Sequence, residues 1–153
     1  MPEMRAEAEA NATGKKPQPT GLSKPEVERL AGHFAAKVGY VTAASIDAVV
    51  NKLGGKIEFR DLDELTNQTG SLDVRGRGDF TIFLPWYTGR LRDRFTIAHE
   101  LGHYVLHSRL GQQPIRVDRA ESNELEWEAN WFAAALLMPQ AEFEPLYRDG
   151  ASI

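Results

Sequence analysis

The hydrophobic period changes twice along the chain. Apolar residues recur at helical spacing from about residue 23 to 53, alternate like strands between 56 and 84, and return to helical spacing from about residue 89. A 3.6-residue repeat gathers apolar side chains on one face of a helix, whereas a strand needs a repeat of two. Helices therefore flank a small sheet in the sequence, which predicts an α+β fold with a mostly antiparallel sheet packed against helices.

Capping and breaking residues set the expected limits of these elements. Ser, Pro and Glu form a capping box at the start of the first helix, and Gly39, Gly54 and Pro139 mark ends. The predicted helices span residues 23–37, 45–53, 89–107, 122–138 and 142–148. The predicted strands span residues 56–60, 72–75 and 80–84, and the last two are expected to form a hairpin.

The N-terminal residues differ in composition from the rest of the chain. Residues 1–21 contain Pro, Gly and Ala but no Leu, Ile, Val or Phe. Such a segment cannot bury enough apolar surface to offset the loss of chain entropy. We therefore predict a disordered tail over residues 1–22 and a single folded domain over residues 23–153.

The composition excludes several classes of protein. Without cysteine, a disulfide scaffold, a thiol nucleophile and a cysteine-ligated metal site are excluded. A formal net charge of −4 argues against direct binding of nucleic acid, because phosphate binding usually requires a basic surplus. The apolar runs are too short for a membrane span, and the N-terminus lacks a secretory signal. We expect a cytoplasmic protein, and the composition indicates no oligomeric state.

The segment His99-Glu100-Leu101-Gly102-His103 is an HExxH motif on a predicted helix. Four residues of α-helix give about 400° of rotation and about 6 Å of rise, so the two imidazoles lie one turn apart on one face. That separation allows both rings to bind one zinc ion. Glu100 is rotated off this axis and can accept a proton from a water that the metal polarises. The motif predicts a zinc hydrolase, although so short a pattern also arises by chance.

A catalytic zinc site needs a third protein ligand and one open position. Three glutamates lie on the next predicted helix, at positions 124, 126 and 128. Glu126 and Asn130 share one edge of the apolar stripe of that helix, and Asn130 can orient a ligand from behind. We therefore favour Glu126, and expect Glu124 and Glu128 to face Arg side chains or solvent. The alternative is that all three belong to a solvated acidic face.

His107 is a second candidate for the third ligand, because it follows His103 at another four-residue step. Each such step drifts about 40° around an α-helix, so His107 is expected about 80° from His99. Three ligands from one straight helix also suit a tetrahedral site poorly. We therefore expect His107 to be structural or to lie at the rim of the site.

Two longer segments resemble the ImmA/IrrE family of zinc metallopeptidases. The first is RFTIAHELGH at residues 94–103, and the second is EWEANWFAAALLMP at residues 126–139. With the preceding sheet, the resemblance covers about residues 27–148. It implies a minimal thermolysin-like (gluzincin) core and carries the third zinc ligand of the family onto Glu126. The Asn of the family likewise falls on Asn130.

The resemblance also implies an activity. Family members typically relieve repression by cleaving a helix-turn-helix repressor, in mobile elements or stress responses. Because this chain contains no helix-turn-helix segment, we expect the repressor to be a separate protein. The prediction is a zinc endopeptidase with His99, His103 and Glu126 as ligands and Glu100 as general base. The alternative is a zinc-stabilised module that regulates a partner without proteolysis, but an intact Glu100 favours the enzyme.

The strand that directly precedes the HExxH helix is a candidate substrate-binding element. A strand at the edge of a sheet can bind an extended peptide by backbone pairing. We therefore predict that this strand contacts substrate through Phe80, Ile82 and Leu84.

Overall fold

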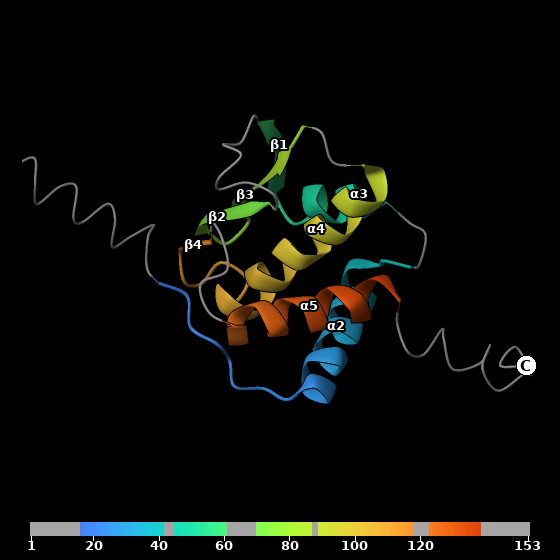
Figure 1. Ribbon diagram of the computed structural model, residues 1–153, viewed down its shortest axis with the longest axis vertical. Helices are drawn as coiled ribbons and strands as arrows, with labels where there is room; N and C mark the ends of the chain where they lie inside the picture. Colours follow the sequence, from blue (N-terminus) through green and yellow to red (C-terminus); the bar gives the residue numbers. More distant parts are fainter. Residues whose placement is uncertain (1–15, 42–44, 61–69, 87–88, 118–122, 139–153) are drawn as a thin grey trace, which may run out of the picture.

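The computed structural model describes residues 16–41, 45–60, 70–86, 89–117 and 123–138, and it confirms the α+β class (Figure 1). The helices described are α2 (Lys24–Val38), α3 (Ile46–Lys52), α4 (Arg90–Gly102) and α5 (Asn123–Leu137). The strands described are β1 (Gly55–Arg60), β2 (Ser71–Gly76), β3 (Asp79–Pro85) and β4 (Ile115–Val117). A π-helical turn, η1 (His103–His107), extends α4. The helix predicted at 142–148 lies outside the described residues.

The limits of the first helix follow from its end residues. The Ser23 side chain accepts a hydrogen bond from the Glu26 backbone N–H, and the Glu26 carboxylate accepts one from the Ser23 N–H at 2.9 Å. Helix α2 ends at Gly39, whose φ of 71° is the left-handed conformation that glycine adopts without strain. The predicted capping box and the predicted end of this helix are both confirmed.

The four strands form one mixed sheet in the order β1-β3-β2-β4. Strands β2 and β3 form the predicted antiparallel hairpin, β4 pairs antiparallel with β2, and β1 pairs parallel with β3. Strand β4 was not predicted, because its three residues are too few to show a period of two. Two of the three pairings are antiparallel, as predicted for this sheet.

The prediction that β3 binds substrate is wrong. Strand β3 lies inside the sheet, with β1 on one side and β2 on the other, so its backbone cannot pair with a peptide. Phe80, Ile82 and Leu84 are at most 1% exposed. The Phe80 ring instead stacks on the ring of Tyr104, at 4.0 Å between centroids, and the Tyr104 hydroxyl accepts a hydrogen bond from the Gly78 N–H. Strand β3 therefore packs against η1 through the Phe80 ring rather than binding substrate.

Helix α4 crosses the middle of the molecule between the sheet and helix α5, which in turn packs against α2 (Figure 1). Gly102 permits a very close approach of α4 to α5. A Cβ at this position would lie 3.2 Å from both the Cα and the carbonyl oxygen of Ala129. The HExxH motif and the first turns of α5 are therefore brought together by near contact of their backbones.

Helices long and apolar enough to cross a membrane are not found in the described part of the chain.

Candidate metal centre

Three predicted ligands meet where α4, η1 and α5 come together. The His99 Nε2 atom lies 3.1 Å from Glu126 Oε1, and the His103 Nε2 atom lies 3.1 Å from Glu126 Oε2. One ligand atom from each of the three residues lies within 4.8 Å of the other two. The structure therefore brings together the two histidines of the HExxH motif and the downstream acid Glu126, as predicted.

Asn130 fixes the orientation of the first imidazole. It lies one helical turn beyond Glu126 on α5, and its Oδ1 atom is 2.8 Å from His99 Nδ1. An amide oxygen only accepts hydrogen bonds, so His99 donates from Nδ1. In the neutral ring the Nε2 lone pair then points towards Glu126. Asn130 thus occupies the orienting position that was predicted from its spacing.

A second set of contacts orients His103. Its Nδ1 lies 2.9 Å from His107 Nδ1, and His107 Nε2 lies 2.8 Å from Glu128 Oε1. The ionised carboxylate of Glu128 can only accept, so His107 carries its proton on Nε2. In neutral His107 the Nδ1 atom is then an acceptor, so His103 must donate from Nδ1. The Nε2 atom of neutral His103 carries no proton and faces Glu126 Oε2.

This arrangement of protons and lone pairs fits a bound cation. With His99 and His103 both neutral, two imidazole lone pairs and a carboxylate converge without a hydrogen between them. Such a contact is repulsive unless a positive charge lies within it. Two imidazole nitrogens and one carboxylate are the donor set of catalytic zinc sites with three protein ligands. The residues present therefore fit zinc.

The pKa values in the absence of metal follow from the same contacts. Burial lowers the pKa of His103 to about 4, which keeps this ring neutral at pH 7. Burial alone would raise the pKa of Glu126, but its contacts with His103 and His99 outweigh burial and hold that pKa well below its usual range. Burial also acts to lower the pKa of His99, but the contact with Glu126 and the charge of Glu100 outweigh it and raise that pKa. His99 therefore holds a proton more tightly in the metal-free protein than an ordinary imidazole does.

Glu100, the predicted general base, is buried beside these ligands. It is 3% exposed and lies next to His99 on α4. Its negative charge contributes to the raised pKa of His99, as expected for a carboxylate close to that ring. The structure thus places an acid beside the three candidate ligands, in the interior of the protein.

His107 is a structural residue, as one of the two predicted alternatives had it, whereas the expectation that Glu128 faces Arg side chains or solvent is wrong. Both residues are buried, at 3% exposed, and they contact each other instead of the rim of the site or solvent. The sequence argument assumed α-helical geometry as far as His107, but the backbone there forms a wider π turn, in which Ser108 N–H donates to the His103 carbonyl. The wider turn brings His107 behind His103. Local spacing alone gave no indication of this change.

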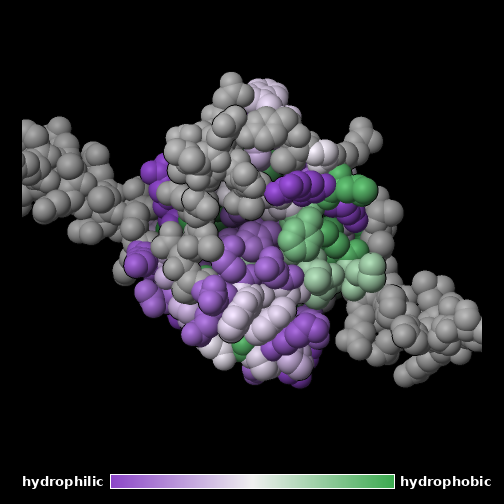
Figure 2. All heavy atoms as spheres, in the orientation of Figure 1, coloured by the Kyte–Doolittle hydropathy of each residue, from purple (hydrophilic) through white to green (hydrophobic). Residues whose placement is uncertain are grey.

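Exposed apolar side chains lie on α4 and directly after α5. Figure 2 shows a hydrophobic area beside a largely hydrophilic surface, over the start of α4 and the end of α5. Leu91, Phe95 and Met138 come from these segments and are 84%, 41% and 63% exposed. The Phe95 ring lies 6.4 Å from the His99 ring between centroids. Apolar surface therefore extends to the edge of the candidate metal centre.

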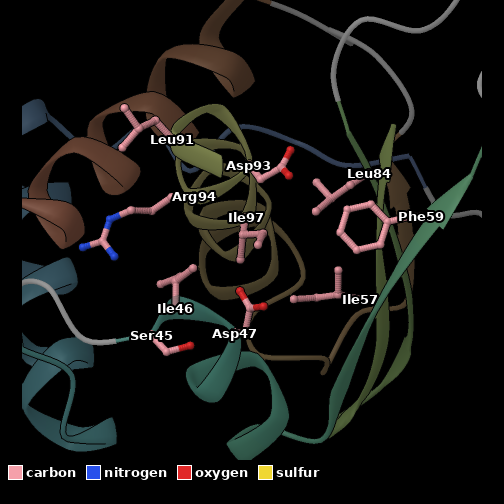
Figure 3. Close-up of a pocket in the computed structure, with 10 residues that line it drawn as sticks. All are labelled: Ser45, Ile46, Asp47, Ile57, Phe59, Leu84, Leu91, Asp93, Arg94 and Ile97. Atoms are coloured by element: carbon pink, nitrogen blue, oxygen red, sulfur yellow. The ribbon is translucent and has the colours of Figure 1, made fainter. Parts of the chain in front are cut away.

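A separate cavity of about 680 Å³ lies between α3, β1 and the first half of α4 (Figure 3). Leu84 and Ile97 contribute to its wall, and Asp47, Asp93 and Arg94 supply charge. None of the residues that form the candidate metal centre lines this cavity. We therefore treat it as distinct from that centre.

Comparison with known protein families identifies a family that matches this chain. The family model of the peptidase M78 group, described as the IrrE N-terminal-like domain, matches residues 52–153. The matched segment covers more than half of the chain and includes the sheet, the HExxH helix and α5. No curated protein matches the sequence.

Proposed function

The chain belongs to the peptidase M78 family of metallopeptidases, the family of the IrrE N-terminal-like domain, and from this premise we propose that it is a zinc-dependent endopeptidase. The observation that carries the proposal is the convergence of His99, His103 and Glu126, with Glu100 buried beside them. A structural metal site has no use for a buried acid at that position. A hydrolytic site needs one to accept a proton.

Each residue has a distinct role in this reaction. His99, His103 and Glu126 would hold the zinc ion, which would supply Lewis-acid polarisation of the water and the scissile carbonyl. Glu100 accepts the proton that the water loses as it attacks the carbonyl carbon. Glu100 then donates that proton to the leaving amine, so that the peptide bond breaks and the carboxylate is regenerated.

The surroundings of the site support a polypeptide substrate. Leu91 and Phe95 expose apolar surface on the same helix as His99, and a peptide can cover that surface when it binds. The repressor is a finer proposal. We propose that the substrate is a separate helix-turn-helix repressor, cleaved in the cytoplasm to relieve repression in a mobile-element or stress response. The resemblance to the ImmA/IrrE family supports this choice.

The test is to compare the wild-type protein with Glu100→Gln, which keeps the shape of the side chain but removes the proton acceptor. Each purified protein, loaded with zinc, is incubated with helix-turn-helix repressors from the same genome, and fragments are identified by mass spectrometry. We expect cleavage by the wild type, and a rate about 100- to 10,000-fold lower for Glu100→Gln at unchanged zinc content.

Two results would contradict the proposal. Equal cleavage by Glu100→Gln would remove this residue from the mechanism. Stable binding of the repressor by both proteins, without fragments, would favour the alternative of a regulatory module that does not cut its partner.

A further inference from the structure

A buried chain of hydrogen bonds leads from His103 away from the metal centre. His103 Nδ1–H donates to His107 Nδ1 at 2.9 Å, and His107 Nε2–H donates to Glu128 Oε1 at 2.8 Å. The side chains of His103, His107 and Glu128 are at most 4% exposed. Water therefore has little access to these polar atoms, and each depends on the next for its hydrogen bonds.

This series of hydrogen bonds continues into the segment that precedes α2. The backbone N–H of Thr20 donates to Glu128 Oε1 at 2.9 Å, and the N–H of Gly21 donates to Glu128 Oε2 at 3.0 Å. Gly21 has a φ of 79°, a left-handed conformation that lets two consecutive N–H groups point towards one anion. Pro17, in the same segment, is buried. More than 100 residues of sequence separate the two ends of this contact.

We propose that His107 and Glu128 are positioning residues for the metal ligand His103, and that the Thr20–Gly21 backbone holds Glu128 in place. This inference rests on the proposed zinc site. Glu128 fixes the proton on His107 Nε2, and His107 then fixes the proton on His103 Nδ1. The Nε2 lone pair of His103 is thereby directed at the metal, so a segment at the N-terminal side of the domain controls how tightly zinc is held.

The first test replaces His107 in two ways. His107→Phe fills the same space but removes both hydrogen bonds, and leaves His103 Nδ1–H without an acceptor. His107→Gln can keep both bonds, because its amide oxygen accepts and its amide nitrogen donates. We expect the zinc affinity, measured by competition with a chelator, to fall about 10- to 100-fold in His107→Phe and to recover in His107→Gln. His33→Gln, on the exposed face of α2, is the control.

The ring proton is observed directly by nuclear magnetic resonance. The chain contains four histidines, so the long-range ¹H–¹⁵N spectrum of their rings can be assigned by single substitutions. We expect zinc-loaded wild type to show the proton of His103 on Nδ1 and that of His107 on Nε2. A proton of His107 on Nδ1, or equal zinc affinity in His107→Phe and the wild type, would overturn the inference.

The second test addresses the other two links. Glu128→Ala removes the acceptor of three hydrogen bonds, whereas Glu124→Ala removes an exposed acid one turn earlier on α5. Thr20→Pro removes one N–H donor, and Gln18→Pro places the same ring on an exposed residue of the same segment. We expect weaker zinc binding only in Glu128→Ala and Thr20→Pro, with the larger loss in Glu128→Ala.

The outcomes separate this inference from the proposed function. If the wild type and its variants bind no zinc, the proposed metal site is wrong. A second outcome is that the wild type binds zinc and His99→Ala does not, while both Glu128→Ala and Thr20→Pro bind zinc like the wild type. The proposed metal site is then correct, and the positioning role of His107, Glu128 and the Thr20–Gly21 backbone is wrong. The melting temperature of each metal-free variant is compared with that of the wild type, so that a variant that has lost its fold is recognised. If His107→Phe or Glu128→Ala does not fold, the zinc affinities of His107→Gln and Thr20→Pro test the inference.

Discussion

At the scale of single residues, positions fixed by helical spacing could be predicted, whereas positions that depend on contacts distant in sequence could not. His99, Glu100 and His103 lie on α-helical spacing, which places them relative to one another whatever the rest of the chain does. Glu126 and Asn130 are likewise related by one helical turn on α5. The relative positions of these residues could therefore be predicted from the sequence.

His107 and Glu128 could not be assigned in the same way. The position of His107 depends on a π turn, and the burial of Glu128 depends on a segment more than 100 residues away. Neither feature leaves a local pattern. Only the fold, which brings α4, α5 and the N-terminal segment together, shows that these two residues lie next to the candidate ligand His103.

The pH dependence of zinc binding is a prediction at this scale. Zinc competes with a proton for His99, whose pKa is raised above its ordinary value of 6.5 in the metal-free protein. Burial lowers the pKa of His103 to about 4, so His103 does not compete near neutral pH. We expect the zinc affinity to fall about tenfold per pH unit as the pH drops below the pKa of His99.

Through His99, the folding stability of the metal-free protein depends on pH in the opposite direction to the zinc affinity. Because the folded pKa of His99 is raised, its protonated form stabilises the metal-free protein below pH 6.5, and this contribution is lost as the pH rises through the folded pKa. Zinc titrations and melting curves between about pH 5.5 and 8.5 measure both effects. A zinc affinity that does not change across this range would contradict the raised pKa of His99.

At the scale of secondary-structure elements, local signals predicted the helices and strands better than their arrangement. Ser23 and Gly39 delimit α2 through their own backbone conformations and hydrogen bonds, so its limits could be predicted. The place of β3 in the sheet depends on which strands pair with it. The nearly continuous apolar run from Phe80 to Leu84 is nevertheless typical of a strand covered on both faces, and it was the available sign of an interior strand.

The close contact of α4 with α5 gives a prediction about Gly102. Alanine normally stabilises a helix relative to glycine by about 0.5–1 kcal/mol. At Gly102 the new methyl group would press on the backbone of Ala129, which cannot move unless α5 moves. We expect Gly102→Ala to destabilise the protein by about 1–3 kcal/mol and to weaken zinc binding, because α5 carries Glu126.

The matched control for Gly102 is Gly32, which lies on the exposed side of α2 and has nothing within 4 Å of an added Cβ. Gly32→Ala should stabilise the protein and leave zinc binding unchanged. Thermal and denaturant unfolding of both variants measure the difference. A stabilised Gly102→Ala with normal zinc affinity would show that the two helices can separate without cost to the site.

At the scale of the whole molecule, the metal centre connects parts of the fold that are far apart in sequence. Two candidate ligands come from the α4–η1 segment and the third from α5, so a bound ion would link these elements directly. Zinc at 100 times its dissociation constant should stabilise the folded state by about 2.7 kcal/mol. We expect removal of zinc by a chelator to lower the melting temperature by about 5–10 °C.

The control for this prediction is Glu126→Ala, which removes one ligand. Its melting temperature should not respond to a chelator, because little metal is bound at the start. A wild-type protein that melts at the same temperature with and without chelator, despite a measured loss of zinc, would show that the ion does not stabilise the contact between α4 and α5.

The last prediction concerns where the folded unit begins. The sequence predicts a boundary at Ser23, but Pro17 is buried, Leu22 packs against the core, and Thr20 and Gly21 donate to Glu128. A chain that starts at residue 16 keeps all of these contacts, so we expect it to bind zinc and to melt like the full-length protein.

A protein that starts at Ser23 loses these contacts. Comparison of the two truncated proteins therefore shows whether the folded unit begins near residue 16 or at Ser23. Without Thr20 and Gly21, the buried carboxylate of Glu128 keeps only the hydrogen bond from His107 among its three donors. A buried charged group that loses its partners costs about 1–3 kcal/mol or more, so this chain should melt at a lower temperature. Because Glu128 then holds His107 less firmly, the zinc affinity should also fall, by about 10–100-fold. Melting curves and chelator competition on the two truncated proteins measure both quantities. If the chain from Ser23 matches the full-length protein in both, the segment before Ser23 is dispensable and the positioning chain ends at Glu128.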